Sequence, residues 1–156
     1  MSIVIRRAGP GDGIVLHTML RELAEHHEAP FTAAAQDYEG FLADPEAVNG
    51  ALIAFADGTP AGCATWQRSY STFRGRETIY MEDIAVLPPF RRRGIGGALF
   101  QAVARMAVAR KAEAVTWLMM GWNEEARRFY ARHGAEIEDG VCFCKISGPA
   151  LERLGQ

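Results

Sequence analysis

Hydrophobic positions follow two different periods along this 156-residue chain. Runs that are apolar throughout, or that alternate with polar residues, predict strands at Ser2–Ala8, Ala51–Ala56, Ala61–Arg68, Thr78–Leu87, Ala114–Met120 and Val141–Ile146. Apolar residues that recur every three or four positions predict helices, which begin after Asp12, cover Ala33–Leu42 and Ile95–Lys111, and begin again at Asn123.

The order of these elements predicts a fold class. Asp57-Gly58-Thr59-Pro60 separates two strand-like runs and predicts a hairpin, whereas Ser69–Arg76 is expected to be a polar loop. A strand, helices, an antiparallel middle and then a strand–helix–strand–helix–strand order indicate a mixed α/β (α+β) layout on one sheet. No repeat, low-complexity segment or linker interrupts the chain, so residues 1–156 are expected to form a single domain.

Composition narrows the class of protein. No apolar run approaches the ~20 residues that a membrane span needs, and the N-terminus lacks the pattern of a secretory signal. We therefore expect a cytoplasmic protein that does not bind membranes. Its three cysteines, Cys63, Cys142 and Cys144, are expected to be reduced thiols. Two of them share one predicted strand face, but no second pair completes a zinc site, so no metal is expected.

Charge is unevenly distributed, although the formal net charge is only −2. Between Arg91 and Arg132 there are nine Arg or Lys against three Asp or Glu, and the rest of the chain has eight against sixteen. This asymmetry predicts one region for an anionic ligand and another for a cationic one. An ordinary solvated surface remains an alternative for the acidic part. The low net charge and the lack of aromatic residues among the arginines at 91–93 argue against nucleic-acid binding.

The segment RRRGIGG at 91–97 brings three arginines and three glycines to the start of a predicted helix. It is not a Walker phosphate loop, because Ala98-Leu99 follow its glycines in place of Gly-Lys-Ser/Thr. It is not a dinucleotide-binding turn either, because Leu99 stands at the third glycine position. Glycines still allow close backbone approach, and the N–H groups at a helix start bind phosphate. The segment therefore predicts a phosphate or pyrophosphate site; the alternative is a basic loop that precedes a helix.

This segment is similar to the Arg/Gln-x-x-Gly-x-Gly/Ala signature of the GCN5-related N-acetyltransferase (GNAT) superfamily. As in that family, it follows a strand that ends in Val86-Leu87-Pro88 and precedes a long helix, and the later segment WNEEARRFYARHGA at 122–135 resembles the family's C-terminal motif. The order of elements fits over essentially the whole chain. The resemblance implies one acetyltransferase domain with a mostly antiparallel central sheet, helices on both faces, and acetyl-coenzyme A in a cleft at the centre of the sheet.

The resemblance also implies which residues bind acetyl-coenzyme A. The pyrophosphate would lie on the backbone amides of Arg92–Gly97, with the arginines at its rim, and the pantetheine arm would follow Ile84–Val86. Asn123 would contact the coenzyme and also cap its helix. The implied cofactor-binding residues are Ile84, Ala85, Val86, Arg91, Arg92, Arg93, Gly94, Ile95, Gly96, Gly97 and Asn123.

Two adjacent acids, Glu82 and Asp83, interrupt an otherwise apolar strand. Regular alternation places them on opposite faces, with Asp83 on the face of Met81 and Ala85. Only a β-bulge would then bring both acids to one amine. The alternative is that one acid is solvated and the other caps a loop.

The resemblance implies direct acetyl transfer to an amine. The residue that matches Glu82 is the proposed general base, acting directly or through water, and the tyrosine that matches Tyr130 is the proposed general acid for the departing thiolate. Tyr130 follows Asn123 by seven residues, so both lie on one helix face. A position in the core, beside Phe129, is the alternative for this tyrosine.

The acceptor side most resembles the diamine (spermidine/spermine) and thialysine acetyltransferase group. The resemblance is carried by YSTFRGR at 70–76, IYMED at 79–83 and the Trp-Asn…Tyr segment. It implies a primary amine of a small cationic acceptor (polyamine, thialysine or lysine-like) and a homodimer. The implied substrate-binding residues are Glu28, Asp83, Tyr70 and Phe73. The alternatives are an acetyltransferase that acts on a peptide or protein amine, and an inactive module that binds acetyl-coenzyme A.

Overall fold

The computed structural model describes residues 1–44 and 47–155. It divides into two compact units, Met1–Leu118 and Met119–Gln156, and each unit is described by itself. The first unit holds a five-stranded sheet in the order β1 (Ile3–Arg7), β2 (Asn49–Ala56), β3 (Thr59–Ser71), β4 (Arg76–Val86) and β5 (Val115–Thr116). The first three pairs of neighbours are antiparallel and the β4–β5 pair is parallel, which confirms the predicted mixed, mostly antiparallel sheet.

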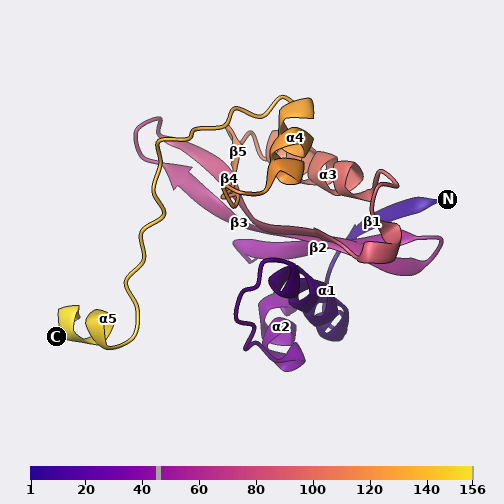
Figure 1. The fold of residues 1–156 in the computed structure, drawn as a ribbon, viewed down its shortest axis with the longest axis horizontal. Helices are drawn as coiled ribbons and strands as arrows, with labels where there is room; N and C mark the ends of the chain where they lie inside the picture. The colour runs from indigo at the N-terminus through magenta and orange to yellow at the C-terminus, as the bar shows by residue number, and fades with distance from the viewer. Residues whose placement is uncertain (45–46, 156) are drawn as a thin grey trace. The chain divides into compact units, whose positions relative to one another are not determined.

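Helices cover both faces of this sheet, as predicted (Figure 1). Helices α1 (Gly13–His26) and α2 (Ala35–Leu42) lie on one face, and α3 (Ile95–Ala109) lies on the other. The core between the sheet and the α1–α2 layer consists of the buried residues Ala8, Leu16, Met19, Leu20, Leu42, Ala51, Ile53, Cys63 and Ala85. Helix α3 buries one residue per turn, namely Ile95, Leu99, Val103 and Ala107.

The start of α1 is fixed by a carboxylate from α2. Glu39 accepts hydrogen bonds from the backbone N–H groups of Gly11 (2.8 Å) and Gly13 (2.7 Å), so it binds donors that a helix start leaves without partners. Asp12, the predicted cap, instead binds the guanidinium of Arg6 at 2.6 and 2.8 Å. The two helices of this layer are thereby joined at the end that carries Glu39.

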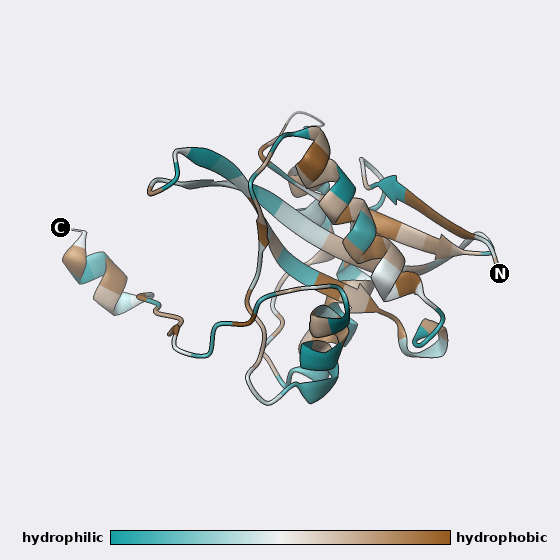
Figure 2. Ribbon diagram, turned by 90° about the horizontal axis from the view of Figure 1, so that it is seen from above, coloured by the Kyte–Doolittle hydropathy of each residue, from teal (hydrophilic) through white to brown (hydrophobic). Residues whose placement is uncertain are grey.

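The two hairpins differ in how well the sequence predicts them. The β2–β3 turn is confirmed: Asp57 and Gly58 both have positive φ (48° and 82°), which the tight two-residue turn requires. The β3–β4 connection is shorter than the predicted loop, since β3 continues to Ser71 and β4 begins at Arg76. This distal part of the hairpin is mostly hydrophilic (Figure 2) and is paired along its length, so its polar side chains belong to exposed strands.

Two predicted strands are wrong in part or in whole. The run Ala114–Met120 forms only the two-residue β5, because β4 pairs with it at Ile79 and Tyr80 alone. In the second unit, Val141–Ile146 forms no strand, because a strand needs a ladder partner and the described residues supply none there. Its apolar side chains are exposed, which a periodicity argument cannot foresee.

The second unit contains α4 (Glu124–Arg132) and α5 (Pro149–Leu154), and the sequence did not predict the latter. Asn123 caps α4, because its side-chain oxygen accepts a hydrogen bond from the N–H of Ala126 at 3.0 Å. No helix among the described residues is both long and apolar enough to span a bilayer.

Candidate active site

A β-bulge stands at Glu82. Met81 pairs with Trp66, whereas Asp83 pairs with the preceding residue, Thr65, so Glu82 is an extra residue in β4. Directly paired residues point to the same face of a sheet, and Thr65 and Trp66 point to opposite faces. Asp83 therefore lies on the face opposite Met81, which corrects the prediction from regular alternation.

The bulge brings both acids to the face that packs on α1 and α2. Asp83 now shares a face with Tyr80, whose partner is Gln67, and with Ala85 of the α1-side core. The pKa of Tyr80 is raised by burial and then by the negative charges of Glu82 and Asp83, which indicates that all three groups are close. The sequence analysis required a β-bulge to bring both acids to one amine, and the structure has such a bulge.

Asp83 is held by a buried hydroxyl. The Oγ1 of Thr65 donates to Asp83 Oδ2 at 3.1 Å and accepts from the Asp83 backbone N–H at 3.1 Å. Thr65 itself is 6% exposed. Burial raises the pKa of Asp83, while the Thr65 bond and the charge of His27 lower it in turn. Because both bonds act on one residue, Thr65 fixes the direction of this carboxylate.

Glu82 is the more accessible acid of the pair. Its side chain is exposed at the bulge, and its pKa is raised first by partial burial and then by the charge of Asp83. A carboxylate with a raised pKa accepts a proton more readily, which suits a general base near neutral pH.

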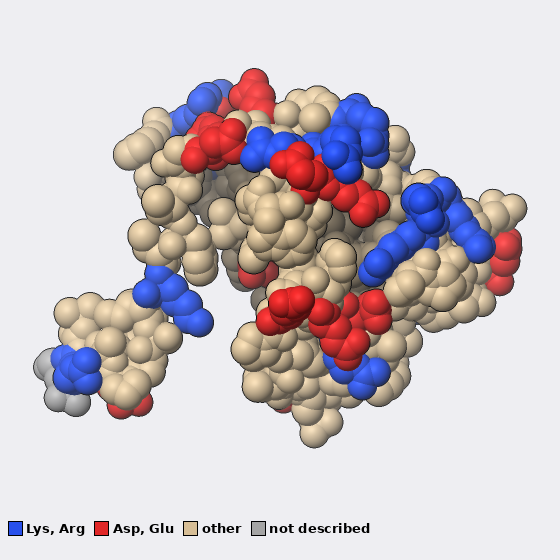
Figure 3. Space-filling view, in the orientation of Figure 1, with Lys and Arg blue, Asp and Glu red and all other residues tan. Residues whose placement is uncertain are grey.

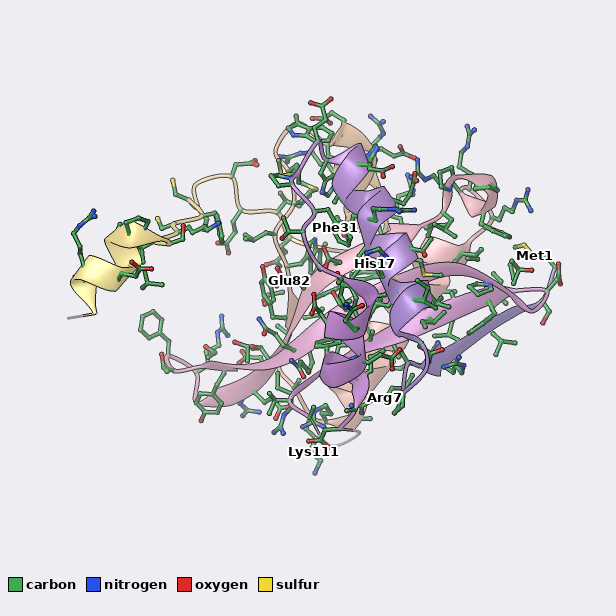
Figure 4. The ribbon with its side chains drawn as sticks, turned by 90° about the horizontal axis from the view of Figure 1, so that it is seen from below. Met1, Arg7, His17, Phe31, Glu82 and Lys111 are labelled. Carbon is green, nitrogen blue, oxygen red and sulfur yellow. The ribbon has the colours of Figure 1, made fainter. Side chains whose placement is uncertain are left out.

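A cavity of about 190 Å³ opens beside Asp83, and we name it the α1–β4 cavity. Its lining residues are Leu20, Leu23, Ala24, His27, Ala29, Phe31 and Asp83. The segment that carries Phe31 is tied to α1 by His17, whose Nε2 lies 3.1 Å from the carbonyl oxygen of Ala33 and whose ring packs on Phe31 at 5.2 Å (Figure 4). A carbonyl only accepts, so Nε2 of His17 carries the proton.

Beyond the bulge, one edge of β4 is open. Among the described residues β5 pairs with β4 at Ile79 and Tyr80 alone, so the edge from Met81 to Val86 on that side has no strand beside it. Unpaired backbone groups on a strand edge are ready to pair with an extended ligand. The predicted contact strip 84–86 lies on this open edge.

The glycine-rich segment forms a tight turn, which we name the phosphate turn (residues 91–97). Arg92 and Gly94 both have positive φ (59° and 83°), and α3 begins directly after Gly94. The first bond of the helix runs from the N–H of Ala98 to the carbonyl of Gly94 at 3.0 Å, so the amides of residues 95–97 have no partner within the helix. Such a helix start favours an anion.

The three arginines of the phosphate turn are not equivalent. The Nε of Arg91 donates to the Val86 carbonyl at 3.0 Å, and its guanidinium lies 3.6 Å from the carboxylate of Glu22 on α1. Arg93 lies over the ring of Phe90, 5.9 Å from its centroid. Arg91 therefore joins the turn to the sheet and to α1, which is a structural role that the sequence did not predict.

The two helical layers of the first unit carry opposite charge. Residues 13–44, which include α1 and α2, contain six Asp or Glu and one Arg, whereas residues 88–112 contain six Arg or Lys and no acid. Acidic groups over α1 are visible in Figure 3. The charge asymmetry of the sequence thus separates across the sheet, with acids on the side of the α1–β4 cavity and bases on the side of α3.

The other predicted site residues are placed less decisively. Tyr70 and Phe73 lie at the distal end of the β3–β4 hairpin and are exposed. Tyr70 pairs with Glu77, five residues before Glu82, and at ~3.3 Å per residue that is roughly 16 Å along the strand. Glu28 is exposed and follows the cavity residue His27 without lining the cavity itself. The first unit does not bring these three residues to Asp83.

In the second unit, Tyr130 lies on α4 and is 6% exposed. Its ring packs edge-to-face on Phe129 with centroids 5.1 Å apart. Among the described residues no group of three or more His, Cys, Asp or Glu is arranged to hold a metal ion.

Comparison with known proteins identifies the fold's relatives. The acetyltransferase (GNAT) family matches residues 16–135, which is well over half of the chain. The chain belongs to this family. Acetyl-coenzyme A is the family's acetyl donor, so it is the ligand that the phosphate turn and the open edge of β4 should fit.

Several named relatives act on small amines. A thialysine N-ε-acetyltransferase from Bos taurus is 32% identical over 97% of this chain and 96% of its own length. An L-ornithine N5-acetyltransferase from Arabidopsis thaliana is 31% identical over 83% of this chain, which spans about half (53%) of that protein. A tyramine N-feruloyltransferase from Nicotiana tabacum is 33% identical over 60% of this chain and 41% of its own length.

Solved structures agree on the GNAT fold. An integron cassette protein from the mobile metagenome of V. cholerae superimposes with a TM-score of 0.82 at 22% identity, covering 100% of this chain and 99% of the other. An aminoglycoside acetyltransferase from an uncultured soil sample superimposes with a TM-score of 0.78 at 18% identity, covering 93% and 95%.

The GNAT chain has features that fit acetyl-coenzyme A. Two features of the phosphate turn suit its pyrophosphate. Gly94 has a left-handed conformation, and the amides of residues 95–97 have no partner within the helix. The open edge of β4 suits the amide groups of its pantetheine arm. Asn123, which caps α4, is the remaining predicted contact.

Sequence reasoning missed three residues of the acceptor side: Thr65, Tyr80 and His27. Thr65 and Tyr80 lie within runs that predict ordinary strands, and the sequence predicts no functional role for His27. Thr65 could have been noticed as the one hydroxyl in a run of small apolar residues, AGCATW at 61–66. Nothing in the local sequence indicates that His27 and Asp83 line one cavity.

Proposed function

We propose that this protein transfers the acetyl group of acetyl-coenzyme A directly to a primary amine of a small cationic acceptor. One observation carries the proposal: the bulge at Glu82 places two acids together at the open edge of β4, on the acidic side of the sheet. The names of the amine-acetylating relatives support the same acceptor class, including side-chain amines such as those of ornithine and thialysine.

In this proposal each side of the site has one task. The amides of 92–97 and the basic side chains around them bind the pyrophosphate, and residues 84–86 align the thioester arm. Glu82 removes a proton from the ammonium group, directly or through water, so that the amine can attack the thioester carbonyl. The C–S bond then breaks, and the thiolate takes up a proton that we assign to the hydroxyl of Tyr130. The amide nitrogen loses its remaining extra proton in the same step, and this proton restores the hydroxyl.

Substrate positioning supplies much of the acceleration in such a direct transfer, so no covalent enzyme intermediate is needed. In its ionised form, Asp83 attracts the cationic acceptor. Its negative charge also keeps the pKa of Glu82 raised, which maintains Glu82 as a base of suitable strength.

The test is an acceptor panel with acetyl-coenzyme A as donor. Ornithine, thialysine, lysine, 1,4-diaminobutane and spermidine are each offered, and released thiol and acetylated product are measured. Turnover of at least one of these amines is expected. Folded protein that binds acetyl-coenzyme A but acetylates none of these amines would exclude a small cationic acceptor and leave the two alternatives, a peptide-amine acetyltransferase and a coenzyme-binding module.

The role of Tyr130 has its own test. Tyr130→Phe removes the hydroxyl and keeps the ring that packs on Phe129. We expect kcat to fall by about 100-fold, the lower range for loss of a general acid, while the Kd for acetyl-coenzyme A stays within about twofold. Unchanged kcat would remove Tyr130 from the mechanism.

A further inference from the structure

The α1–β4 cavity has an unusual composition for its size. Within about 190 Å³ it has one carboxylate, Asp83, and one imidazole, His27, and its other five lining residues are apolar. A volume of this size holds a small polar group with a few non-hydrogen atoms. A ligand group that fits must therefore be small, must satisfy both polar side chains and must carry little else that is polar.

The carboxylate of Asp83 and the backbone that carries His27 are each held by hydrogen bonds. Thr65 directs the carboxylate of Asp83 through its hydroxyl at 3.1 Å. His27 follows the last residue of α1, and its backbone N–H donates to the carbonyls of Leu23 and Ala24 at 3.0 and 3.1 Å. The next residue, Glu28, has a positive φ of 52°, which turns the chain so that the N–H of Ala29 returns to the carbonyl of Ala24 at 2.9 Å. The cavity wall around His27 is therefore a defined turn.

A carboxylate and an imidazole in one small cavity are complementary to an ammonium and a carboxylate on one carbon atom. Asp83 attracts the ammonium, and the imidazole donates a hydrogen bond to the carboxylate, most strongly when it is protonated. An α-amino-acid head group with its first methylene is a small polar group of this kind. The apolar side chains of Leu20, Leu23 and Phe31 then contact the methylene.

We propose that the α1–β4 cavity binds the α-amino-acid head group of the acceptor, and that His27 determines specificity by selecting amino acids over the corresponding diamines. This inference rests on the proposed acetyl transfer and deepens it. The reacting amine at the far end of the acceptor side chain then lies toward Glu82, one residue from Asp83 at the bulge.

A diamine is expected to bind more weakly when His27 is protonated. Its distal ammonium also binds Asp83, but it has no carboxylate for His27 and is repelled by a protonated imidazole. Protonation of His27 therefore strengthens binding of the amino acid and weakens binding of the diamine. The ratio of the two reactivities reports on His27 and cancels effects common to both acceptors, such as the ionisation of Glu82.

The titratable groups around His27 and Asp83 determine the pH range in which His27 can be tested. His27 has its pKa lowered from the ordinary value by burial and by the charge of His26, and raised in part by Asp83. Facing Asp83 are Tyr38 from α2, Cys63 from β3, and Tyr80 and Glu82 from β4, each coupled to it electrostatically. The pKa of both Tyr38 and Cys63 is raised, so these two groups stay neutral below pH 8 and do not distort the range from pH 8 to 5.5.

The matched acceptors are ornithine and 1,4-diaminobutane, which differ by one carboxylate. We expect kcat/KM for ornithine divided by that for 1,4-diaminobutane to rise by about tenfold as the pH falls from 8 to 5.5, the size of one charge-assisted hydrogen bond. In His27→Gln the ratio is expected to be lower at every pH and independent of pH. His26→Gln changes the neighbouring histidine, which does not line the cavity, and is expected to retain the rise.

Binding provides a second readout that needs no turnover. Titration calorimetry in two buffers of different ionisation heat is expected to show proton uptake when ornithine binds and proton release when 1,4-diaminobutane binds; His27→Asn, a smaller neutral variant, is expected to lose the uptake. Failure of the proposed function appears as absence of acetylation on every amine. Failure of this inference appears as a pH-independent ratio in the wild type, or as the same ratio and the same proton uptake with and without His27.

Discussion

The phosphate turn and the α1–β4 cavity lie in one unit of this GNAT chain, but they are built in different ways. The turn is made of seven consecutive residues, and its function depends on backbone amides and two positive φ values. The cavity is assembled from α1, the segment that follows it and the bulged strand β4, and its function depends on side chains. The donor side is thus a local structure, and the acceptor side is a tertiary one.

This difference affects how each side can vary. Backbone N–H groups can donate to any pyrophosphate, so in the proposed function the turn binds the donor without a need for particular side chains. The cavity can change its acceptor by substitution of one lining residue, since its single carboxylate and single imidazole set the charge. The opposite charges of the two helical layers fit the proposed function, in which the donor is an anion and the acceptor a cation.

The largest expected effect separates catalysis from donor binding. Glu82→Gln keeps the size of the side chain and removes its basicity, so we expect kcat/KM to fall by about 100-fold to 10,000-fold, the usual contribution of a general base. The Kd for acetyl-coenzyme A, measured by calorimetry, is expected to stay within about twofold. Asp57→Asn is the control, because it removes a carboxylate charge at the β2–β3 turn, where asparagine is well tolerated. Equal activity of the two variants would exclude Glu82 as the base.

A smaller effect is expected at the phosphate turn. Gly94 has φ of 83°, and an added Cβ meets nothing within 4 Å, so Gly94→Ala costs backbone strain without a clash. A left-handed alanine costs about 1–2 kcal/mol, so we expect the Kd for acetyl-coenzyme A to rise by about tenfold. The KM for the acceptor is expected to stay unchanged. In the control Gly40→Ala, inside α2, the Kd stays constant and stability increases by about 0.5–1 kcal/mol; a changed acceptor KM in Gly94→Ala would show that the two sides are coupled.

The same contrast explains what the sequence could predict. The turn at 91–97 and the helix start after Gly94 follow from the sequence, because these residues are consecutive and have a local signature, whereas phosphate binding there stays a prediction. The fold follows from hydrophobic periods, except where strand pairing decides: β4 pairs with β5 at Ile79 and Tyr80 alone, and Val141–Ile146 has no strand partner among the described residues. Periodicity cannot show whether a strand has a neighbour.

Only part of the proposed acceptor side could be predicted from the sequence. Both acids were recognised, but their shared face depends on the register of β3 against β4, which is set by the whole hairpin and not by the residues at 79–86. Thr65 and His27 approach Asp83 from segments 18 and 56 residues away in the sequence. Such contacts are products of tertiary packing, and one sequence holds no local record of them.

Thr65 tests whether the orientation of Asp83 matters to the acceptor alone. Thr65→Val keeps the shape of the side chain and removes the hydroxyl that holds the carboxylate, so the pKa of Asp83 rises further and its direction is less fixed. We expect the acceptor KM to rise by about fivefold, the size of one net hydrogen bond, with the Kd for acetyl-coenzyme A unchanged. Thr116→Val on exposed β5 is the matched control. An acceptor KM that is equal in both variants would assign Thr65 to the core only.

The smallest expected effect concerns stability on the side of α3, away from the α1–β4 cavity. Glu77 on β4 binds Arg110, the residue after α3, at 2.6 Å and Arg68 of β3 at 2.6 Å, and these bonds lower its pKa to about 2. A carboxyl whose folded pKa lies below its unfolded value stabilises the fold above the unfolded value, near 4.5, and this contribution is lost as the pH falls toward 2. Glu77→Gln is therefore expected to lower the urea midpoint slightly at pH 6 and to flatten its decrease between pH 5 and 2.5, whereas Glu152→Gln on α5 leaves both unchanged. Because the group is exposed and salt screens it, the difference should shrink in 1 M salt; an equal pH slope in both variants would show that the link between α3 and the hairpin does not contribute to folding.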